Sequence, residues 1–449
     1  MRAKPSQELP ERVPAGAKQA GEEPPPPRKW LTATSSAVWT ERMLATLERG
    51  ITGGKWYSLV DKVWDERTLT LAAWEVIRNE GAPGIDHRTV GQLEARLAEE
   101  VRRLGQGLRG NTYEPQAVKR VWIDKPGSRE KRPLGIPVVR DRVVQGAVRA
   151  VIEPIFERSF AEHSYGFRPG RSAQQAVGRV EQLLAEGHHW VVDADLKGYF
   201  DSIPQDKLLA AIGEKIADSR VLGLIEAFLK QGVMETAQGW QPTERGTPQG
   251  AVLSPLLANI YLNPLDQYMV QQGVEMIRYA DDFILMCRSQ SQAQEAMELM
   301  RRWVEGAVLV LHPEKTRWVD ASQRGGFEFL GWHFERGHKW PRDKSVARFK
   351  ESLRQESRRN SGQSLSRSIA RINRRTRGWM AYFGGGAGNL YERLDQWIRM
   401  RLRSVLRRRA RRKGRGRGRD HNRYTNAYFA EHGLISLKAL AHVQRANPA

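Results

Sequence analysis

Residues 276–285 read Met-Ile-Arg-Tyr-Ala-Asp-Asp-Phe-Ile-Leu and place two adjacent carboxylates between two runs of strand-forming residues. Apolar and aromatic residues on both sides of a short polar break are typical of a β-hairpin. The pattern therefore predicts a hairpin with Asp281 and Asp282 at its turn. Apolar strands would hold such a turn rigidly, as a divalent-metal site requires. For these two residues alone, a solvent-exposed acidic turn without chemistry is the alternative.

A second acidic strand end lies upstream of the hairpin. Residues 190–195 (Trp-Val-Val-Asp-Ala-Asp) are a strand candidate, and Asp193 and Asp195 would point to one face of that strand. Beside the hairpin, an acid at this strand end could help to hold two metal ions. Two ions about 3.5–4 Å apart stabilise the attacking and leaving oxygens of a phosphoryl displacement, as nucleotide polymerases need. Taken alone, Asp195 could equally be a helix or turn cap.

The composition favours a nucleic-acid partner. The 449 residues include 73 Lys and Arg against 51 Asp and Glu, a formal net charge of +22, and so positive a field attracts polyanions. A merely soluble basic surface is the alternative. The single cysteine, Cys287, excludes a disulfide framework and a cysteine-based zinc cluster. Without an apolar run of about 18 residues or a signal-peptide pattern, we expect a cytoplasmic protein with no membrane partner.

The sequence pattern changes along the chain. Residues 1–30 are rich in Pro, Glu, Lys and Ala without an apolar period, which predicts a disordered tail. Residues 31–78 have a helical period and are expected to form an N-terminal extension. From about 113 to 335, short β-rich runs such as 118–123 alternate with helical stretches, a mixture typical of an α/β or α+β domain. Past about residue 340 the pattern is helical, with interleaved arginines.

Several short sequence motifs follow one another along the chain in a defined order. They are GAPGID (81–86), the segment 113–145, EPIF (153–156) running to SYGFRPGR (164–171), DLKGYFD (195–201), RGTPQG (245–250) with LSPLLAN (253–259), YADD (279–282), LHPEKT (311–316) and FLGW (329–332). In this order the chain resembles group II intron-encoded reverse transcriptases, also called maturases, of the bacterial type without a C-terminal zinc-type endonuclease domain. Two departures from the family pattern are Asp124, where proline is usual, and His312, where asparagine is frequent.

The resemblance implies a right-hand polymerase of the α/β (α+β) class with an antiparallel palm sheet. Fingers and palm would occupy residues 79–338, a helical thumb or X domain 339–410, and a basic DNA-binding segment 411–449. The aromatic and arginine-bearing stretches 377–383 and 394–399 look like parts of the thumb. The arginine tract 407–419 would add salt-sensitive phosphate binding, with a solvated charged tail as the alternative.

The resemblance also implies the site residues. Asp195, Asp281 and Asp282 would be catalytic and hold two Mg²⁺ ions, helped by the Leu196 carbonyl, since Mg²⁺ prefers oxygen ligands. The implied nucleotide-binding residues are Lys125 and Arg132 for the triphosphate, Phe200 against a ribose 2′-hydroxyl, and Gln249 near the nascent base pair. For Lys125 and Arg132 the alternative is solvated cations on a hairpin, and for Phe200 an ordinary core residue.

Template, primer and RNA contacts complete the implied set. Arginine can bind phosphate in a bidentate manner, which suits the arginines among the residues expected here. The expected template or primer contacts are Arg168, Arg171, Gly84, Lys315 and Gly331. The expected RNA contacts are Arg377, Arg399, Arg401 and Arg403.

The implied function is that of an RNA-directed DNA polymerase. It would bind group II intron RNA, assist its splicing, and copy it at a DNA target by attack of a primer 3′-hydroxyl on a dNTP. Its partners would be the intron RNA, the DNA target, a template–primer duplex and dNTPs; monomer and dimer stay open. Two other functions also stay open. One is a free-standing reverse transcriptase adopted by its host for defence or DNA repair, and the other is a non-catalytic RNA-binding splicing factor.

Overall fold

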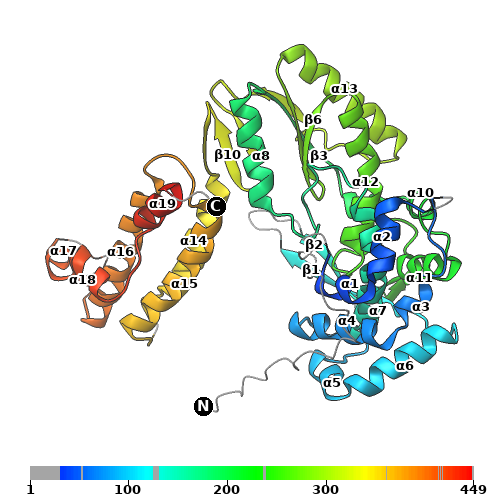
Figure 1. Cartoon of the computed structure of the whole chain (residues 1–449). Helices are drawn as coiled ribbons and strands as arrows, with labels where there is room; N and C mark the ends of the chain where they lie inside the picture. Colours follow the sequence, from blue (N-terminus) through cyan, green and yellow to red (C-terminus); the bar gives the residue numbers. More distant parts are fainter. Residues whose placement is uncertain are drawn as a thin grey trace, which may run out of the picture.

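The computed structural model describes residues 31–51, 54–124, 131–235, 239–360, 362–412, 414, 416 and 418–446. A large body of helices and sheets carries a smaller helical unit, formed by the C-terminal part of the chain, at one side (Figure 1). Among the described helices, none combines the length and apolar character that a membrane crossing requires.

The helices and strands have the following bounds. The helices of the body are α1 Ala33–Val38, α2 Glu41–Arg49, α3 Val60–Val63, α4 Glu66–Arg78, α5 Val90–Ala95, α6 Leu97–Arg109, α7 Val139–Glu157, α8 Ala173–Ala185, α9 Tyr199–Ser202, α10 Gln205–Gly213, α11 Ser219–Lys230, α12 Ser254–Gln271 and α13 Gln290–Gly306. The strands are β1 Val118–Asp124, β2 Lys131–Ile136, β3 Trp190–Asp195, β4 Val233–Glu235, β5 Gly239–Gln241, β6 Glu275–Tyr279, β7 Asp282–Cys287, β8 Arg317–Asp320, β9 Phe327–Phe329, β10 Trp332–Glu335 and β11 His338–Pro341. The C-terminal helices are α14 Asp343–Glu356, α15 Leu365–Phe383, α16 Leu390–Arg409, α17 Arg419–Arg423, α18 Asn426–Glu431 and α19 Leu437–Ala446.

The N-terminal helices pack into the main body. Thr32 and Asp65 cap α1 and α4 by accepting bonds from free amides of the first turn, which fixes where these helices begin. The Trp39 indole Nε1 donates to the Val151 carbonyl of α7 at 3.2 Å, and both α1 and α4 contact α7. The predicted N-terminal extension therefore shares a hydrophobic core with the body.

Four antiparallel strands in the order β6-β7-β3-β8 form the central sheet. The predicted hairpin is β6–β7, and the strand predicted at 190–195 is β3. Successive side chains of β7 alternate between two faces, with Phe283 in the core shared with α7 and α12 and Ile284 in the core beside α8. Burial on both faces prevents a register slip. This register sets Asp195 directly opposite Asp282.

A second sheet, in the order β2-β1-β4-β5, carries the predicted strand 118–123 as part of β1. β2 pairs antiparallel with β1, and β4 pairs parallel with it. The Gly135 amide of β2 donates to the Gln249 carbonyl at 2.6 Å. A Cβ at Gly135 would lie only 2.6 Å from the Val118 side chain. This sheet therefore rests directly on the loop that precedes α12.

Helices α14, α15, α16, α18 and α19 share a third hydrophobic core. Leu394 of α16 packs there with Phe429 and Leu437 from the last helices. The Asp395 carboxylate accepts bonds from the Ser436 hydroxyl at 2.6 Å and from the Leu437 amide at 2.9 Å. The boundary predicted at residue 410 thus lies inside one packed unit.

Candidate active site

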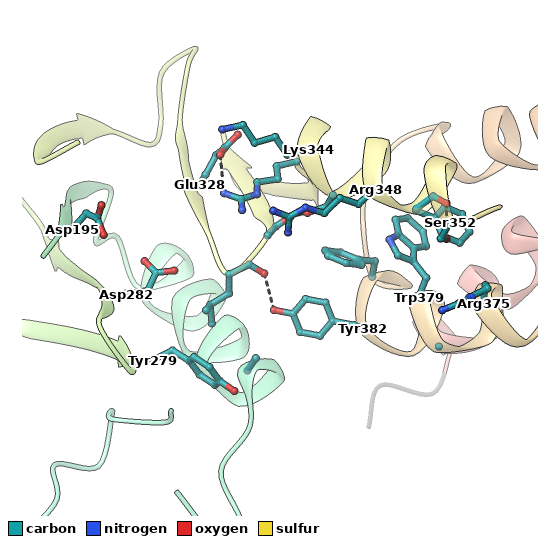
Figure 2. Close-up of a pocket in the computed structure, with 18 of the residues that line it drawn as sticks. Asp195, Tyr279, Asp282, Glu328, Lys344, Arg348, Ser352, Arg375, Trp379 and Tyr382 are labelled. Atoms are coloured by element: carbon teal, nitrogen blue, oxygen red, sulfur yellow. Dashed lines mark hydrogen bonds and ion pairs between the residues drawn. The ribbon is translucent and has the colours of Figure 1, made fainter. Parts of the chain in front are cut away.

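A cleft of about 1690 Å³ separates the central sheet from helices α14 and α15. Asp195 and Asp282 lie on the sheet side, whereas Arg348, Trp379 and Tyr382 project from the helices on the other side (Figure 2). The cleft thus joins a group of acids at the strand ends to a basic and aromatic helical wall. Such a space can hold a polyanion next to a cation-binding edge.

The hairpin turn consists of Ala280 and Asp281. Tyr279 ends β6 and pairs with Asp282, which begins β7, so the turn starts one residue earlier than predicted. Ala280 has φ +61°, a left-handed conformation that costs free energy for a residue with a side chain. Surrounding contacts must therefore hold the turn in place.

Arg278 supplies one of those contacts from a fully buried position. Its guanidinium donates to the Asp266 carboxylate at 2.7 Å from Nε and 2.5 Å from Nη2. Nη1 donates to Asn259 Oδ1 and to the Ala280 carbonyl, each at 2.9 Å. Asp266 and Asn259 both belong to α12. The side chain therefore ties the strained turn to a buried helix, a role that the sequence analysis did not assign.

The 164–171 loop supports the turn from its other side. The Tyr165 amide donates to the Arg278 carbonyl at 2.8 Å, and Asn259 Nδ2 donates to the Gly166 carbonyl at 2.8 Å. A Cβ at Gly166 would lie 2.2 Å from the Ala280 nitrogen. Glycine is therefore required at 166 because the loop backbone lies directly against the turn.

The surroundings of Arg168 oppose its predicted template contact. Its buried guanidinium donates to the Glu157 carboxylate at 2.8 Å and to the carbonyls of Ala161 and Ser164 at 2.6 Å each. These partners occupy the groups that a phosphate would need, so Arg168 instead fixes the loop. Arg171 is half-buried with its guanidinium over the Tyr165 ring, and its template contact stays a prediction.

Four carboxyl groups line the acidic edge of the cleft. Asp282 is open to the cleft, yet protein surrounds it at longer range, and this burial together with Asp193, Asp281 and Asp195 raises its pKa to about 7. Burial also raises the pKa of Asp193 to about 6 and that of Asp281 above its usual range. Each shift reflects mainly the cost of burying a charged carboxylate, and the neighbouring carboxylates add to it. Asp193 was noted in the sequence as a strand neighbour of Asp195, and the structure adds it to this edge.

Lys315 compensates part of this charge, because its Nζ lies 2.5 Å from Asp195 Oδ2. Within the described ranges, no three His, Cys, Asp or Glu side chains close around one point as a ready-made metal site. The chemistry of the edge still suits a hard divalent cation, since carboxylate oxygens are its preferred ligands. A cation between Asp195 and Asp282 would compete with Lys315 for the negative charge of Asp195.

Comparison with known proteins gives matches on both sides of the cleft, to the part of the chain with the acid-bearing sheet and to the part with the helical wall. A family model described as reverse transcriptase (RNA-dependent DNA polymerase) matches residues 123–334, and one described as group II intron, maturase-specific domain matches residues 346–425. Protein YkfC of Escherichia coli (strain K12) is 33% identical over 348 residues, covering 68% of this chain and 89% of YkfC. The chain belongs to the group II intron reverse transcriptase/maturase family.

The other similarities cover smaller parts of the relatives. The group II intron-encoded protein LtrA of Lactococcus lactis subsp. cremoris is 42% identical over 186 residues, 41% of this chain and 31% of LtrA. A solved partial Cas6-RT-Cas1–Cas2 complex aligns with 56% of this chain and 41% of that chain, at 24% identity and a TM-score of 0.34. Apo telomerase from Candida tropicalis aligns with 51% of this chain and 55% of that chain, at 13% identity and a TM-score of 0.40.

Membership confirms the predicted fold class and enzyme class. The protein has a reverse-transcriptase-like polymerase fold with mixed sheets, a reverse transcriptase domain and a helical maturase-specific thumb. This family implies nucleic-acid binding, dNTP substrates and a divalent metal.

Two of the four predicted nucleotide-binding residues, Arg132 and Gln249, line two different hollows. Arg132 lines the cleft and lies close enough to Asp281 to lower its pKa against the larger effect of burial. Gln249 lines a neighbouring pocket of about 380 Å³ and donates to Asp201 Oδ2 at 2.8 Å. Phe200 lines neither hollow and packs half-buried against the Tyr199 ring. The predicted Lys125 lies outside the described residues.

Three other predicted residues have structural surroundings that leave their roles as predictions. A Cβ at Gly84 would lie 2.7 Å from Val138 Cα, so this loop packs closely at the start of α7. Gly331 has φ +86° and its carbonyl accepts bonds from the Arg342 amide and the Ser345 hydroxyl. Leu196 is buried and directly follows Asp195 in the chain, and its backbone carbonyl is the group predicted to help hold Mg²⁺.

The surroundings of Arg403 oppose its predicted RNA contact. Arg403 is buried, and it donates to the Tyr424 carbonyl at 2.8 Å and to Asn426 Oδ1 at 3.0 Å. It therefore ties α16 to the last helices. Arg377 is exposed, Arg399 and Arg401 are half-exposed, and their RNA contacts stay predictions. The sequence analysis missed the basic residues of α14 and α15 that line the cleft, although their three- and four-residue spacing was a signal: Lys344, Arg348, Arg371, Arg374 and Arg375.

Stabilisation of the protein by Mg²⁺ should depend on pH. We expect Mg²⁺ to raise the melting temperature more at pH 8 than at pH 6, because Asp282, with a pKa of about 7, still holds its proton at pH 6. Without Mg²⁺, the free energy of unfolding should fall as pH rises from about 4 to 7. Over this range the folded state still holds the Asp282 proton, whereas the unfolded state has lost it. Thermal melts with and without Mg²⁺ measure both effects. Equal shifts at the two pH values, or an undiminished shift in Asp282→Asn at pH 8, would contradict the assignment.

Proposed function

We propose that this protein is an RNA-directed DNA polymerase that binds its own group II intron RNA, assists splicing of that RNA, and copies it at a DNA target. The observation that carries the proposal is the cleft in which Asp195, Asp281 and Asp282 face the maturase-specific thumb. A polymerase needs the acids, and a maturase needs the basic helical domain beside them.

The side chains would divide the polymerase reaction among themselves. Asp195, Asp281 and Asp282 would hold two Mg²⁺ ions, which supply electrostatic stabilisation of the reacting phosphate when bound. Arg132 would orient the triphosphate from the second sheet, because its guanidinium is exposed on β2 and reaches the cleft. Arg278 would keep the turn in its strained conformation, so that Asp281 stays aimed at the cleft.

Replacing Phe200 should relax the choice of sugar. If its ring closes the sugar pocket, Phe200→Ala should raise the use of rNTPs relative to dNTPs by about 10- to 100-fold, the scale of a steric pocket contact. Single-nucleotide primer extension with each nucleotide measures the ratio. Tyr57→Ala, an exposed aromatic on another surface, is the matched control and should leave the ratio unchanged. An unchanged ratio in Phe200→Ala would mean that this ring is only a packing residue.

The intron function is tested with the transcript of the DNA that flanks the gene. The parent protein should promote splicing of this transcript and, with dNTPs and Mg²⁺, should copy it into DNA at the target. Asp281→Asn should keep the splicing and lose the copying. A flanking sequence without an intron would favour the free-standing reverse transcriptase. Splicing without any copying by the parent would favour the non-catalytic splicing factor.

A further inference from the structure

A short helical turn is fixed against the loop that precedes α12. The turn is α9, which carries Phe200 and Asp201, and the loop consists of residues 245–250. The Thr247 amide donates to the Phe200 carbonyl at 2.7 Å. A Cβ at Gly246 would lie 2.6 Å from the Phe200 carbonyl oxygen and 2.7 Å from Asp201 Cα. The two backbones therefore lie directly against each other, which sets the position of Asp201 relative to the loop.

The backbone around Gln249 is held from two sides, but its side chain depends on one partner among the described contacts. The Gly135 amide of β2 donates to the Gln249 carbonyl at 2.6 Å, and the Ser254 hydroxyl donates to the Pro248 carbonyl at 2.8 Å. The side-chain Nε2 of Gln249 donates to Asp201 Oδ2 at 2.8 Å. A glutamine side chain loses conformational freedom when it is held in one orientation. The bond to Asp201 therefore has to supply that order.

The chemistry of this bond sets the orientation of the amide. An ionised carboxylate can only accept hydrogen bonds, so the NH₂ group of Gln249 must face Asp201. The carbonyl oxygen Oε1 of Gln249 then faces away from Asp201. Both side chains line the pocket of about 380 Å³ next to the cleft. Asp201 therefore decides which end of the Gln249 amide is available to a bound nucleotide.

Arg120 of β1 supports the negative charge of Asp201 from the second sheet. Burial raises the pKa of Asp201, whereas the positive charge of Arg120 and the hydrogen bond from Gln249 lower it. Both of these contacts favour the carboxylate form. Arg120 lines the same pocket, and its guanidinium lies over the Trp122 ring, 5.8 Å from the centroid. Helix α9, the 245–250 loop and the second sheet thus meet around Asp201.

We propose that Asp201 is a positioning residue, which holds the Gln249 amide with its carbonyl oxygen available to the nascent base pair and thereby sets the affinity for the incoming dNTP. The inference rests on the proposed function, in which Gln249 lies near that base pair. Among the described contacts, Asp201 has no bond to the three catalytic aspartates. Its loss should therefore raise the KM for dNTP and leave kcat unchanged, because it weakens binding of the ground state and the transition state alike.

Single-nucleotide primer extension by the full chain, on an RNA template with Mg²⁺, measures KM and kcat. We expect Asp201→Ala to raise the KM for dNTP about five- to tenfold, on the scale of one lost hydrogen bond to a charged group, with kcat within about twofold of the parent. Asp201→Asn still offers an acceptor oxygen and should keep the KM within about threefold. Glu244→Ala removes a carboxylate of the same pocket that has no bond to Gln249 among the described residues, and it should match the parent.

A double variant tests whether Asp201 acts through Gln249. Gln249→Ala and Asp201→Ala/Gln249→Ala should have the same KM within about twofold, because an orienting partner has no effect once the oriented group is gone. A further rise of about fivefold in the double variant would show that Asp201 acts independently and would overturn the inference. A loss confined to kcat in Asp201→Ala would overturn it as well.

Folding and catalysis are checked separately. Asp201 is exposed, so circular dichroism melts of Asp201→Ala should match those of the parent; if they do not, Asp201→Ser, whose side chain is also shorter, takes its place in the same comparison. A parent protein that yields no product would overturn the proposed function and this inference with it. Product from the parent together with an unchanged KM in Asp201→Ala would overturn this inference alone.

Discussion

Asp281→Asn should abolish DNA synthesis on an RNA template, with a fall in kcat on the order of 10³-fold or more. Asp281 is the second residue of a turn that projects into the cleft, and its neighbours Asp195 and Asp282 raise the local negative charge. A neutral amide removes one anionic ligand from the proposed pair of ions. Losing several kcal/mol of charge stabilisation lowers a rate by that factor. Primer extension with a defined RNA template, dNTPs and Mg²⁺ measures the loss.

The control for Asp281→Asn is an acid of the same type away from the cleft. Asp206→Asn changes an exposed aspartate in the first turn of α10 and should extend primers at the parent rate. Template–primer binding by Asp281→Asn should stay within about threefold of the parent, because the basic wall of the cleft is unchanged. Full-length product from Asp281→Asn would refute the metal assignment. Product absent from the parent as well would favour the non-catalytic splicing factor.

Arg278→Ala should destabilise the folded protein by about 3–5 kcal/mol, the cost of leaving a buried charge without its partner. The substitution removes the buried partner of Asp266 and two further hydrogen bonds of the guanidinium, to Asn259 and to the Ala280 carbonyl. Asp266 is 3% exposed, so its carboxylate would stay buried without a charged partner. Urea unfolding followed by circular dichroism measures the change in the free energy of unfolding.

Two comparison variants separate charge from positioning. Arg301→Ala breaks an exposed pair with Glu298, whose side chains are about half exposed, and should cost less than about 1 kcal/mol. Arg278→Lys keeps a positive charge opposite Asp266 but cannot form the forked bonds to Asp266 and the Ala280 carbonyl. It should lower kcat with little change in the KM for dNTP, because it loosens the turn without altering Arg132. Equal losses of stability in Arg278→Ala and Arg301→Ala would disprove the role of the buried network.

Local patterns in the sequence predicted the strands that carry the acids. Alternating apolar residues and the acidic break predicted β6, β7 and β3, and the structure confirms all three. The spacing of apolar residues could not show which two residues form the turn. The left-handed conformation of Ala280 depends on contacts with Arg278, Asn259 and Gly166. Arg278, two positions before the turn, could be seen in the sequence. Its partners Asp266 and Asn259, twelve and nineteen residues away, could not be assigned to it from the sequence.

Arginines were the least predictable residues. Arg168 and Arg403 have the same chemistry as the exposed Arg377, yet both are buried and bound to protein partners. The sequence shows only that a charged residue is present. Its burial and its hydrogen-bond partners decide whether a phosphate can reach it. Lys315 is a related case, since its ion pair joins residues 120 positions apart in the chain.

The sequence by itself determined the order of motifs, the strands that carry Asp195, Asp281 and Asp282, and hence the polymerase chemistry of the family. These features are local, because strand period and turn chemistry operate over a few residues. Only the tertiary structure decided which basic side chains remain available to nucleic acid and how the turn is held. A buried guanidinium must find hydrogen-bond partners in three dimensions, and those partners come from distant parts of the chain.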